Sequence, residues 1–250
     1  MLPLLWSRVS HGLSGLTPFL LLVVAANSSP IAAYARTPAQ EAHCPDTPLV
    51  SAIHNRDVGL AIRLIHAGAK LDEESCGVSG LAEAIVFNNA RVVEELLTQG
   101  ASPNVLDGTK ASPLMTAAFY CRENFVPLLL NHGAKIDSLD KDGYSALMWS
   151  TQNCEDGAMA SVLLGYGTKV DLRTRRSDTA LTVAAFFGNE DAVHVLVSAG
   201  ADVNAKTDDG TALDIARDRQ VGRKSSHDKI YSFLLEVTRL DSRLGPSDSE

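Results

Sequence analysis

The sequence predicts an all-α solenoid, in which helix-turn-helix units stack side by side and send out β-turn loops. Three patterns support this fold class. A glycine followed by Ala or Thr recurs at steps of 32, 33, 34 and 33 residues. A leucine with Ser or Thr two positions before it recurs in the same phase, and an aliphatic pair follows fifteen or sixteen residues later. A period of this length is typical of stacked repeats, because no single unit can bury its apolar face alone.

The repeated positions are as follows. The glycines are Gly68, Gly100, Gly133, Gly167 and Gly200. The leucines are Leu49, Leu81, Leu114, Leu147, Leu181 and Leu213. The hydroxyl residues are Thr47, Ser79, Ser112, Ser145, Thr179 and Thr211. An Asp or Asn follows each glycine by four residues, at Asp72, Asn104, Asp137, Asp171 and Asn204.

Each of these repeated residues predicts one structural part of a unit. The Ser or Thr side chain can accept a hydrogen bond from a backbone N–H at the start of the first helix. Pro48 and Pro113 follow two of these residues, at the helical position where a missing N–H costs least. The second helix buries its aliphatic pair and ends at glycine, which tolerates the left-handed conformation. The Asp or Asn beyond it favours a turn into the next unit.

This pattern resembles the ankyrin repeat, D-x-x-G-x-T-P-L-H-x-A-A followed by V-x-x-L-L-x-x-G-A-D-x-N. The resemblance covers residues 44–238, as about five repeats and a C-terminal capping repeat that opens at 209–216 and closes at 230–237. The histidine that the family has after the leucine is absent, so the hydrogen bonds it makes to neighbouring turns are expected to be missing. Its place is taken by Val50, Ala82, Met115, Met148, Thr182 and Asp214.

The ends of the chain differ from the repeats. Arg8 and His11 precede an apolar run over 19–26, and Ala33-Tyr34-Ala35 is a small-residue cleavage site. These features predict a signal peptide over 1–35, cleaved near Ala35, and therefore a periplasmic or secreted protein. An uncleaved anchor is the alternative, although the run is far shorter than the about 20 residues that span a bilayer. Residues 36–43 are expected to form a linker and 239–250 a disordered tail.

The cysteines lie in equivalent places of adjacent units, 32 and 33 residues apart. An exported protein meets an oxidising compartment, which favours two disulfides, Cys44–Cys76 and Cys121–Cys154. Four reduced thiols are the alternative, because packed helices lie about 8–10 Å apart and bridged Cα atoms within about 7 Å. An extra residue in the turn after Cys154 gives slack that favours the second bridge.

Composition and motifs limit the function classes. The formal net charge of −8 argues against nucleic acid and against anionic lipid as partners. The sequence has no G-x-S-x-G elbow, phosphate loop or H-E-x-x-H helix, and its histidines are scattered over separate units. We therefore expect no enzyme activity, no cofactor and no metal site.

The resemblance to ankyrin repeats implies a concave binding face, built from the first helices and the loop tips. The variable positions five and six residues after each leucine are rich in aromatic residues, which with arginine are frequent in binding hot spots. Packing between first helices is the alternative role for these aromatic side chains. The expected partner-binding residues are Phe87, Phe119, Tyr120, Lys141, Tyr144, Gln152, Asn153, Arg175, Arg176, Phe186 and Phe187.

These observations favour a monomeric, non-enzymatic scaffold that binds another protein in the periplasm or outside the cell. Exported bacterial ankyrin repeat proteins are similar in having a signal segment before a compact set of repeats. Two alternatives stay open: an inhibitor or immunity-type protein of an envelope enzyme, and an accessory protein in peroxide stress defence. The second is implied only by the resemblance to the family.

Overall fold

The described part of the chain is a stack of helices. The computed structural model describes residues 47–75, 77–219 and 226–244. Contacts divide the chain into two units, 1–45 and 46–250, and every described residue belongs to the second. The predicted signal peptide 1–35, the linker 36–43, and both Cys44 and Cys76 lie outside the described residues.

Six consecutive helix pairs, numbered here as units 1 to 6, make up the described part of the chain and confirm the predicted class. The pairs are α3 (Pro48–His54) with α4 (Val58–His66), α5 (Gly80–Val86) with α6 (Ala90–Thr98), α7 (Pro113–Phe119) with α8 (Phe125–Asn131), α9 (Ala146–Asn153) with α10 (Ala158–Gly165), α11 (Ala180–Phe187) with α12 (Glu190–Ser198), and α13 (Ala212–Arg219) with α14 (Ser226–Leu244). A two-residue antiparallel ribbon, β1 (Glu74–Ser75) with β2 (Val78–Ser79), precedes α5.

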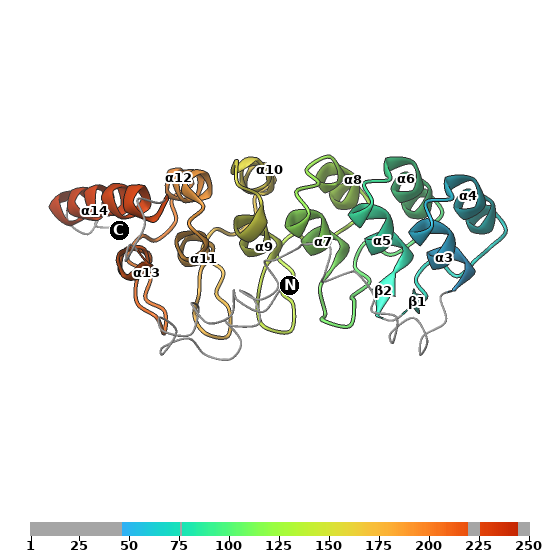
Figure 1. The fold of residues 1–250 in the computed structure, drawn as a ribbon, viewed down its shortest axis with the longest axis horizontal. Helices are drawn as coiled ribbons and strands as arrows, with labels where there is room; N and C mark the ends of the chain where they lie inside the picture. The colour runs from blue at the N-terminus through green and yellow to red at the C-terminus, as the bar shows by residue number, and fades with distance from the viewer. Residues whose placement is uncertain (1–46, 76, 220–225, 245–250) are drawn as a thin grey trace, which may run out of the picture. The chain divides into compact units, whose positions relative to one another are not determined.

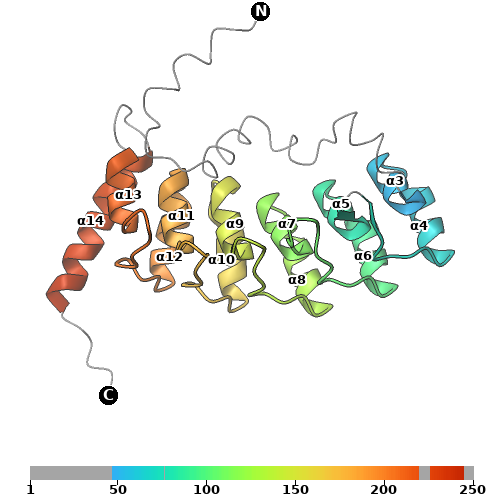
Figure 2. The same cartoon turned by 90° about the horizontal axis from the view of Figure 1, so that it is seen from below.

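The helices form two layers, and the loops between units project beyond the first layer (Figures 1 and 2). The first helices pack in chain order, from α3 against α5 to α11 against α13. The second helices pack likewise, α4 with α6 and α6 with α8, then α10 with α12 and α12 with α14. Within the described ranges, no helix is both long and apolar enough to cross a membrane.

The predicted helix starts and ends are confirmed. Each of the six Ser or Thr side chains accepts a hydrogen bond from the backbone N–H three residues later, as between Ser79 and Ala82 at 3.2 Å. The glycine after each second helix of units 1 to 5 has a positive φ, 91° at Gly133 for example, which an L side chain adopts only with strain. The N–H of Ala134 then reaches back to the carbonyl of Leu129 and closes the helix.

The Asp or Asn after each glycine joins neighbouring units, which its role as a turn former did not predict. Its side-chain oxygen accepts a hydrogen bond from a backbone N–H in the next unit, and the geometry recurs four times. We call these four bonds the inter-unit ladder. They are Ser102 N–H to Asp72, Lys135 N–H to Asn104, Lys169 N–H to Asp137 and Asp202 N–H to Asp171, at 2.8, 2.9, 3.1 and 3.1 Å.

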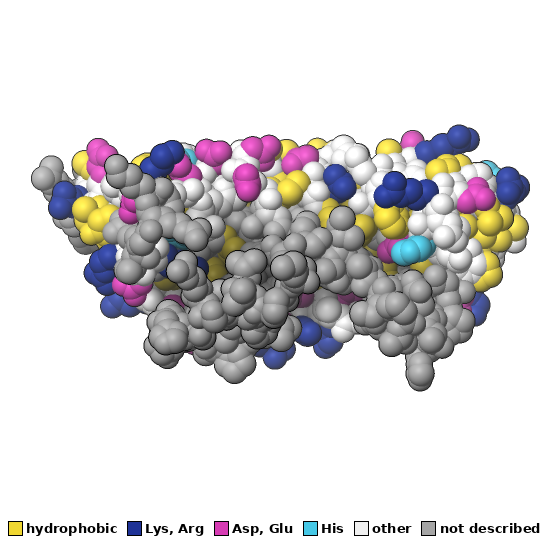
Figure 3. Space-filling model, in the orientation of Figure 1, with side chains coloured by type: hydrophobic (Ala, Val, Ile, Leu, Met, Phe, Trp, Pro, Cys, Tyr) yellow, Lys and Arg dark blue, Asp and Glu magenta, His cyan; other side chains and the backbone are white. Residues whose placement is uncertain are grey.

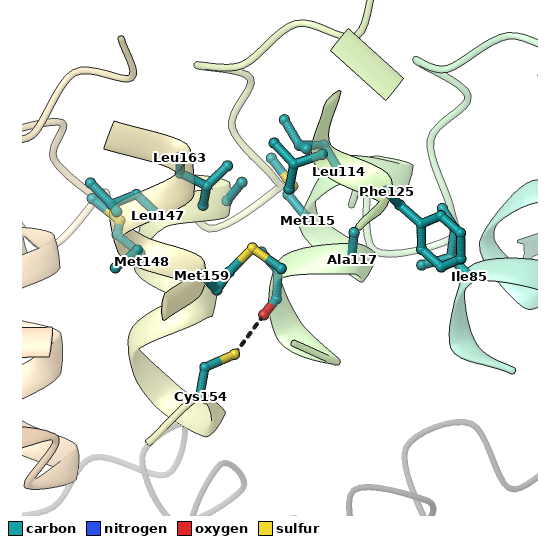
Figure 4. Packing of buried hydrophobic residues seen from close by; sticks show 14 of the residues in the cluster. Ile85, Leu114, Met115, Ala117, Phe125, Leu147, Met148, Cys154, Met159 and Leu163 are labelled. Carbon is teal, nitrogen blue, oxygen red and sulfur yellow. Dashed lines mark hydrogen bonds between the residues drawn. The ribbon is translucent and has the colours of Figure 1, made fainter. Parts of the chain in front are cut away.

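The core is continuous across the stack. Figure 4 shows Leu114 and Met115 of α7, Phe125 of α8, and Leu147 and Leu163 of unit 4 as parts of one buried cluster. Phe125 is 1% exposed and Leu163 is fully buried. Because each unit covers the apolar side of the next, burial supplies the main attraction between them.

Other groups replace the histidine of the family pattern. Met115 and Met148 fill its place in the core, at 1% and 0% exposure. Where the residue is polar it bonds back to the start of its own helix: Thr182 accepts from the N–H of Thr179 at 2.8 Å, and Asp214 from that of Thr211 at 3.1 Å. At these two positions a capping bond within the same helix start takes the place of the histidine's contacts.

Cys121 and Cys154 lie at disulfide distance, with their Cα atoms 5.6 Å apart, as predicted. Cys121 occupies the left-handed position of the turn after α7, with φ 53°. Cys154 is in extended conformation after α9, where the longer turn of unit 4 lets it approach unit 3. Its sulfur also lies 3.2 Å from the carbonyl oxygen of Ala118, the contact dashed in Figure 4.

At the C-terminal end of the stack, the predicted boundary between the repeats and the tail was wrong. A disordered tail was expected from residue 239, but α14 continues to Leu244. The amide of Asn204 in the loop before unit 6 donates to the Asp241 carboxylate at 2.8 Å, which ties the last turns of the helix to the stack. The Asn after Gly200 thus bonds to the capping helix, where another repeat would otherwise follow.

Candidate functional site

The predicted binding residues lie along the ends of the first helices and at the loop tips, a surface called here the first-helix face. All of the aromatic side chains in the set are half-buried, whereas Lys141 and Arg175 at the loop tips are exposed. Figure 3 shows acidic side chains along the edge over the second helices α10 and α12. Whether these residues bind a partner stays a prediction.

An aromatic cluster occupies the junction of units 3 and 4. Phe119 meets Tyr120 edge-on at 5.1 Å between ring centroids, and meets Trp149 edge-on at 5.3 Å. Trp149 also lies 5.6 Å from Tyr144. Among the described residues, Tyr144 and Trp149 pack against the hydrophobic core, while Phe119 and Tyr120 are outside that cluster. The four rings, called here the central aromatic cluster, therefore extend from the core outwards.

Trp149 was missed from the sequence, because only the fifth and sixth positions after each leucine were considered. It precedes Gln152 and Asn153 by three and four residues, the spacing that places side chains on one face of a helix. Its indole N–H donates to the carboxylate of Asp140 at 3.0 Å. Asp140 is 9% exposed and also accepts from the backbone N–H of Tyr144, so one carboxylate holds the indole of Trp149 and the backbone of Tyr144.

Some of the polar residues predicted to bind a partner form contacts between units instead of lying free on the surface. The Asn153 amide donates to the carbonyl of Phe119 at 3.2 Å, which ties unit 4 to unit 3. Arg176 forms an ion pair with Asp209 of the next loop at 3.1 Å. Gln152 is half-buried. Asn153 and Arg176 thus hold neighbouring units together, a role that the sequence did not predict for them.

Both ends of the first-helix face carry an arginine over a phenylalanine. The guanidinium carbon of Arg56 lies 5.0 Å from the ring centroid of Phe87, and that of Arg219 lies 3.3 Å from the ring centroid of Phe186. Phe186 packs against the core, so the alternative of internal packing holds for it, and it meets Phe187 edge-on at 5.2 Å. Stacking of this kind is favourable when the cation is partly desolvated.

Burial dominates the electrostatics of the loops. It raises the pKa of Tyr144 to about 12, and the neighbouring carboxylates of Asp178 and Asp140 act in the same direction. Burial also raises the pKa of Asp178, although a hydrogen bond from Thr174 opposes this. Across the described ranges, no group of three His, Cys, Asp or Glu residues could hold a metal ion. The arrangement offers half-buried aromatic rings, with Lys141 and Arg175 exposed at the loop tips.

Comparison with known proteins agrees with this geometry. A family profile described as "Ankyrin repeats (3 copies)" matches residues 81–174 and 114–207, which together are just over half of the 250 residues. The chain is 27% identical over 205 residues to the Danio rerio protein named "Putative palmitoyltransferase ZDHHC13", covering 79% of this chain. It is 31% identical over 133 residues, 53% of this chain, to the ankyrin repeat domain-containing protein SAT10 of Stachybotrys chartarum.

A third relative is the SH3 and multiple ankyrin repeat domains protein 2 of Homo sapiens, 28% identical over 170 residues, or 64% of this chain. The aligned segments are small parts of these relatives: 31% of the Danio protein, 7% of the Stachybotrys protein and 9% of the human protein. The shared sequence therefore concerns a portion of each relative and not its whole length.

The pKa of Tyr144 gives a testable pH dependence. Because the folded pKa of about 12 lies above the ordinary value of 10, the protonated phenol is favoured in the folded state. Its contribution to stability is complete below pH 10 and is lost as the pH rises towards 12. Urea unfolding between pH 9 and about 12 should show a steeper loss of stability in the wild type than in Tyr144→Phe. Parallel curves would contradict the burial of this phenol.

Proposed function

Because the chain belongs to the ankyrin repeat family, we propose that it is a non-enzymatic scaffold that binds another protein through its first-helix face. Ankyrin repeats imply protein–protein interaction. Neither this role nor the partner's identity follows from the fold alone, since function resides in particular surface residues. The proposal therefore rests on what those residues can do.

The observation that carries it is the central aromatic cluster. Phe119 and Tyr120 are half-buried yet lie outside the hydrophobic core of the described residues. The carboxylate of Asp140 fixes the indole of Trp149, and that indole lies edge-on to Phe119. Rigid aromatic side chains that keep some exposure are what protein interfaces use as anchors, because little entropy is lost when they are covered.

The absence of catalysis is part of the proposal. The matching family profile consists of repeats, and a repeat stack presents an open surface rather than the deep apolar cavity in which small molecules are usually bound. The Danio relative is named a palmitoyltransferase, but the segment shared with this chain is 31% of that protein. Its name therefore does not extend to this chain.

We place the protein in the periplasm or the extracellular space. The charged start, short apolar run and small-residue site over 1–35 support export. The disulfide distance between Cys121 and Cys154 supports it independently, because disulfides persist in oxidising compartments.

Export is tested in the native host by fractionation and mass spectrometry. The expected mature protein begins at Arg36, is recovered outside the cytosol, and yields a Cys121–Cys154 cross-linked peptide before reduction. Intact Met1 together with free thiols at both cysteines, in the cytosolic fraction, would contradict this placement.

The binding surface is tested by Phe119→Ala combined with Tyr120→Ala. We expect capture of a defined partner from an envelope extract to fall about tenfold or more, because truncated aromatic anchors commonly cost at least this much affinity. The melting temperature should fall by less than about 5 °C, since neither ring belongs to the core.

Tyr166→Ala is the matched control, because Tyr166 is an aromatic residue, 50% exposed, that follows the second helix α10. It should leave capture unchanged. Equal capture by the wild type and the double variant, with both folded, would remove the first-helix face as the binding surface.

A further inference from the structure

Two arginines from different units flank the C-terminal end of α5. Arg56, in the turn after α3, lies over the ring of Phe87 at 5.0 Å. Arg122, in the turn after α7, donates from Nη2 to the carbonyl oxygen of Val86 at 3.2 Å. Arg56, Phe87 and Arg122 are called here the arginine–phenylalanine site. It lies on the first-helix face and is assembled from units 1, 2 and 3.

The positive charges of this site have no carboxylate partner within the described residues. No ion pair there includes Arg56 or Arg122. The Nε of Arg122 is moreover buried without a hydrogen-bond acceptor. Among the described residues, Arg122 contacts the carbonyl at the end of α5, which carries a partial negative charge.

Two nearby carboxylates are engaged elsewhere. Glu83, on α5 itself, is 4% exposed and contacts the ring of His54, with Oε1 and Nδ1 2.6 Å apart. Asp57, next to Arg56, accepts the N–H of Leu60 at 2.8 Å and caps α4. By contrast, Arg176 of the loop tips is paired with Asp209. The two arginines at the end of α5 are thus poised for an external anion.

Phe87 restricts which anion fits. Its ring gives the site an apolar wall, edge-on to His54 at 5.8 Å. Arginine on an aromatic face keeps its planar donors available for a carboxylate. The Arg219–Phe186 pair repeats this chemistry at the opposite end of the first-helix face. An acidic side chain next to an apolar one satisfies both features, whereas a bare polyanion satisfies only the charge.

We propose that the partner is recognised here through an acidic segment, in which an Asp or Glu carboxylate binds Arg56 and Arg122 while an adjacent apolar side chain covers Phe87. This rests on the proposed scaffold function and specifies its partner.

The test uses the purified chain and three short synthetic peptides of equal length, with alternating Asp and Leu, Asn and Leu, or Lys and Leu. Titration calorimetry reports binding. We expect only the Asp–Leu peptide to bind, with affinity that falls as salt is raised. A single-stranded oligonucleotide of the same charge should bind more weakly than this peptide.

The variants Arg56→Gln and Arg122→Gln should each weaken the Asp–Leu peptide about tenfold, because a charged hydrogen-bonded pair is lost. Arg122→Lys keeps the charge but loses the planar guanidinium, so its affinity for the Asp–Leu peptide should lie between those of the wild type and Arg122→Gln. Arg91→Gln is the matched control, since Arg91 is an exposed arginine on the second helix α6, and it should bind like the wild type. Arg56→Gln keeps the test valid if Arg122→Gln fails to fold.

Equal binding of the Asp–Leu and Asn–Leu peptides, tighter binding of the oligonucleotide, or no peptide binding at all would overturn the acidic-segment inference. If partner capture is nevertheless lost in the Phe119 and Tyr120 double variant, the scaffold function stands and only this inference fails. If both tests fail, the first-helix face is not the binding surface.

Discussion

The attraction between neighbouring units is the constraint on which the rest of the structure depends. No helix pair here encloses its own core: Leu114 and Phe125 of unit 3 are buried only because other units cover them. Burial has no direction, so it brings units together without fixing their offset. The inter-unit ladder supplies that direction, because an oxygen on one loop must meet one particular N–H of the next.

The geometry of the candidate site depends on this offset between neighbouring units. The central aromatic cluster combines Phe119 and Tyr120 of unit 3 with Tyr144 and Trp149 of unit 4, and the arginine–phenylalanine site draws on three units. Such sites exist only when the units are stacked at the right offset. The contact between Cys121 and Cys154 lies at the same junction as the central aromatic cluster, and so restrains the part of the stack where that cluster is built.

Periodic sequence features predicted the fold well, because each describes a local requirement. A hydroxyl that caps a helix, or a glycine that ends one, needs no knowledge of distant residues, and Ser79 and Gly133 behave as expected. The pairing of Cys121 with Cys154 could also be predicted, since equivalent places in adjacent repeats are neighbours in space. The helix boundary at residue 239 was wrong because the bond between Asn204 and Asp241 is made across units.

The site was less predictable, because its contacts also join residues of different units. Family positions led to Phe119 and Tyr120 but not to Trp149, whose role depends on Asp140 and on a neighbouring ring. Asn153 was expected to face a partner, yet its amide bonds to the carbonyl of Phe119. Arg56 and Arg122 carry no sequence signal at all, because their shared position at the end of α5 arises only when three units are stacked.

Hydrogen exchange at the ladder tests this account most directly. The backbone amides of Ser102, Lys135, Lys169 and Asp202 donate to the preceding unit. The amides of Leu106 and Leu139, in the loops of Ser102 and Lys135, make no such bond to the described residues. The first group should exchange about tenfold more slowly, or slower still, because exposing these amides requires neighbouring units to separate. Equally fast exchange in both groups would contradict it, by showing that the loops do not hold the stack in register.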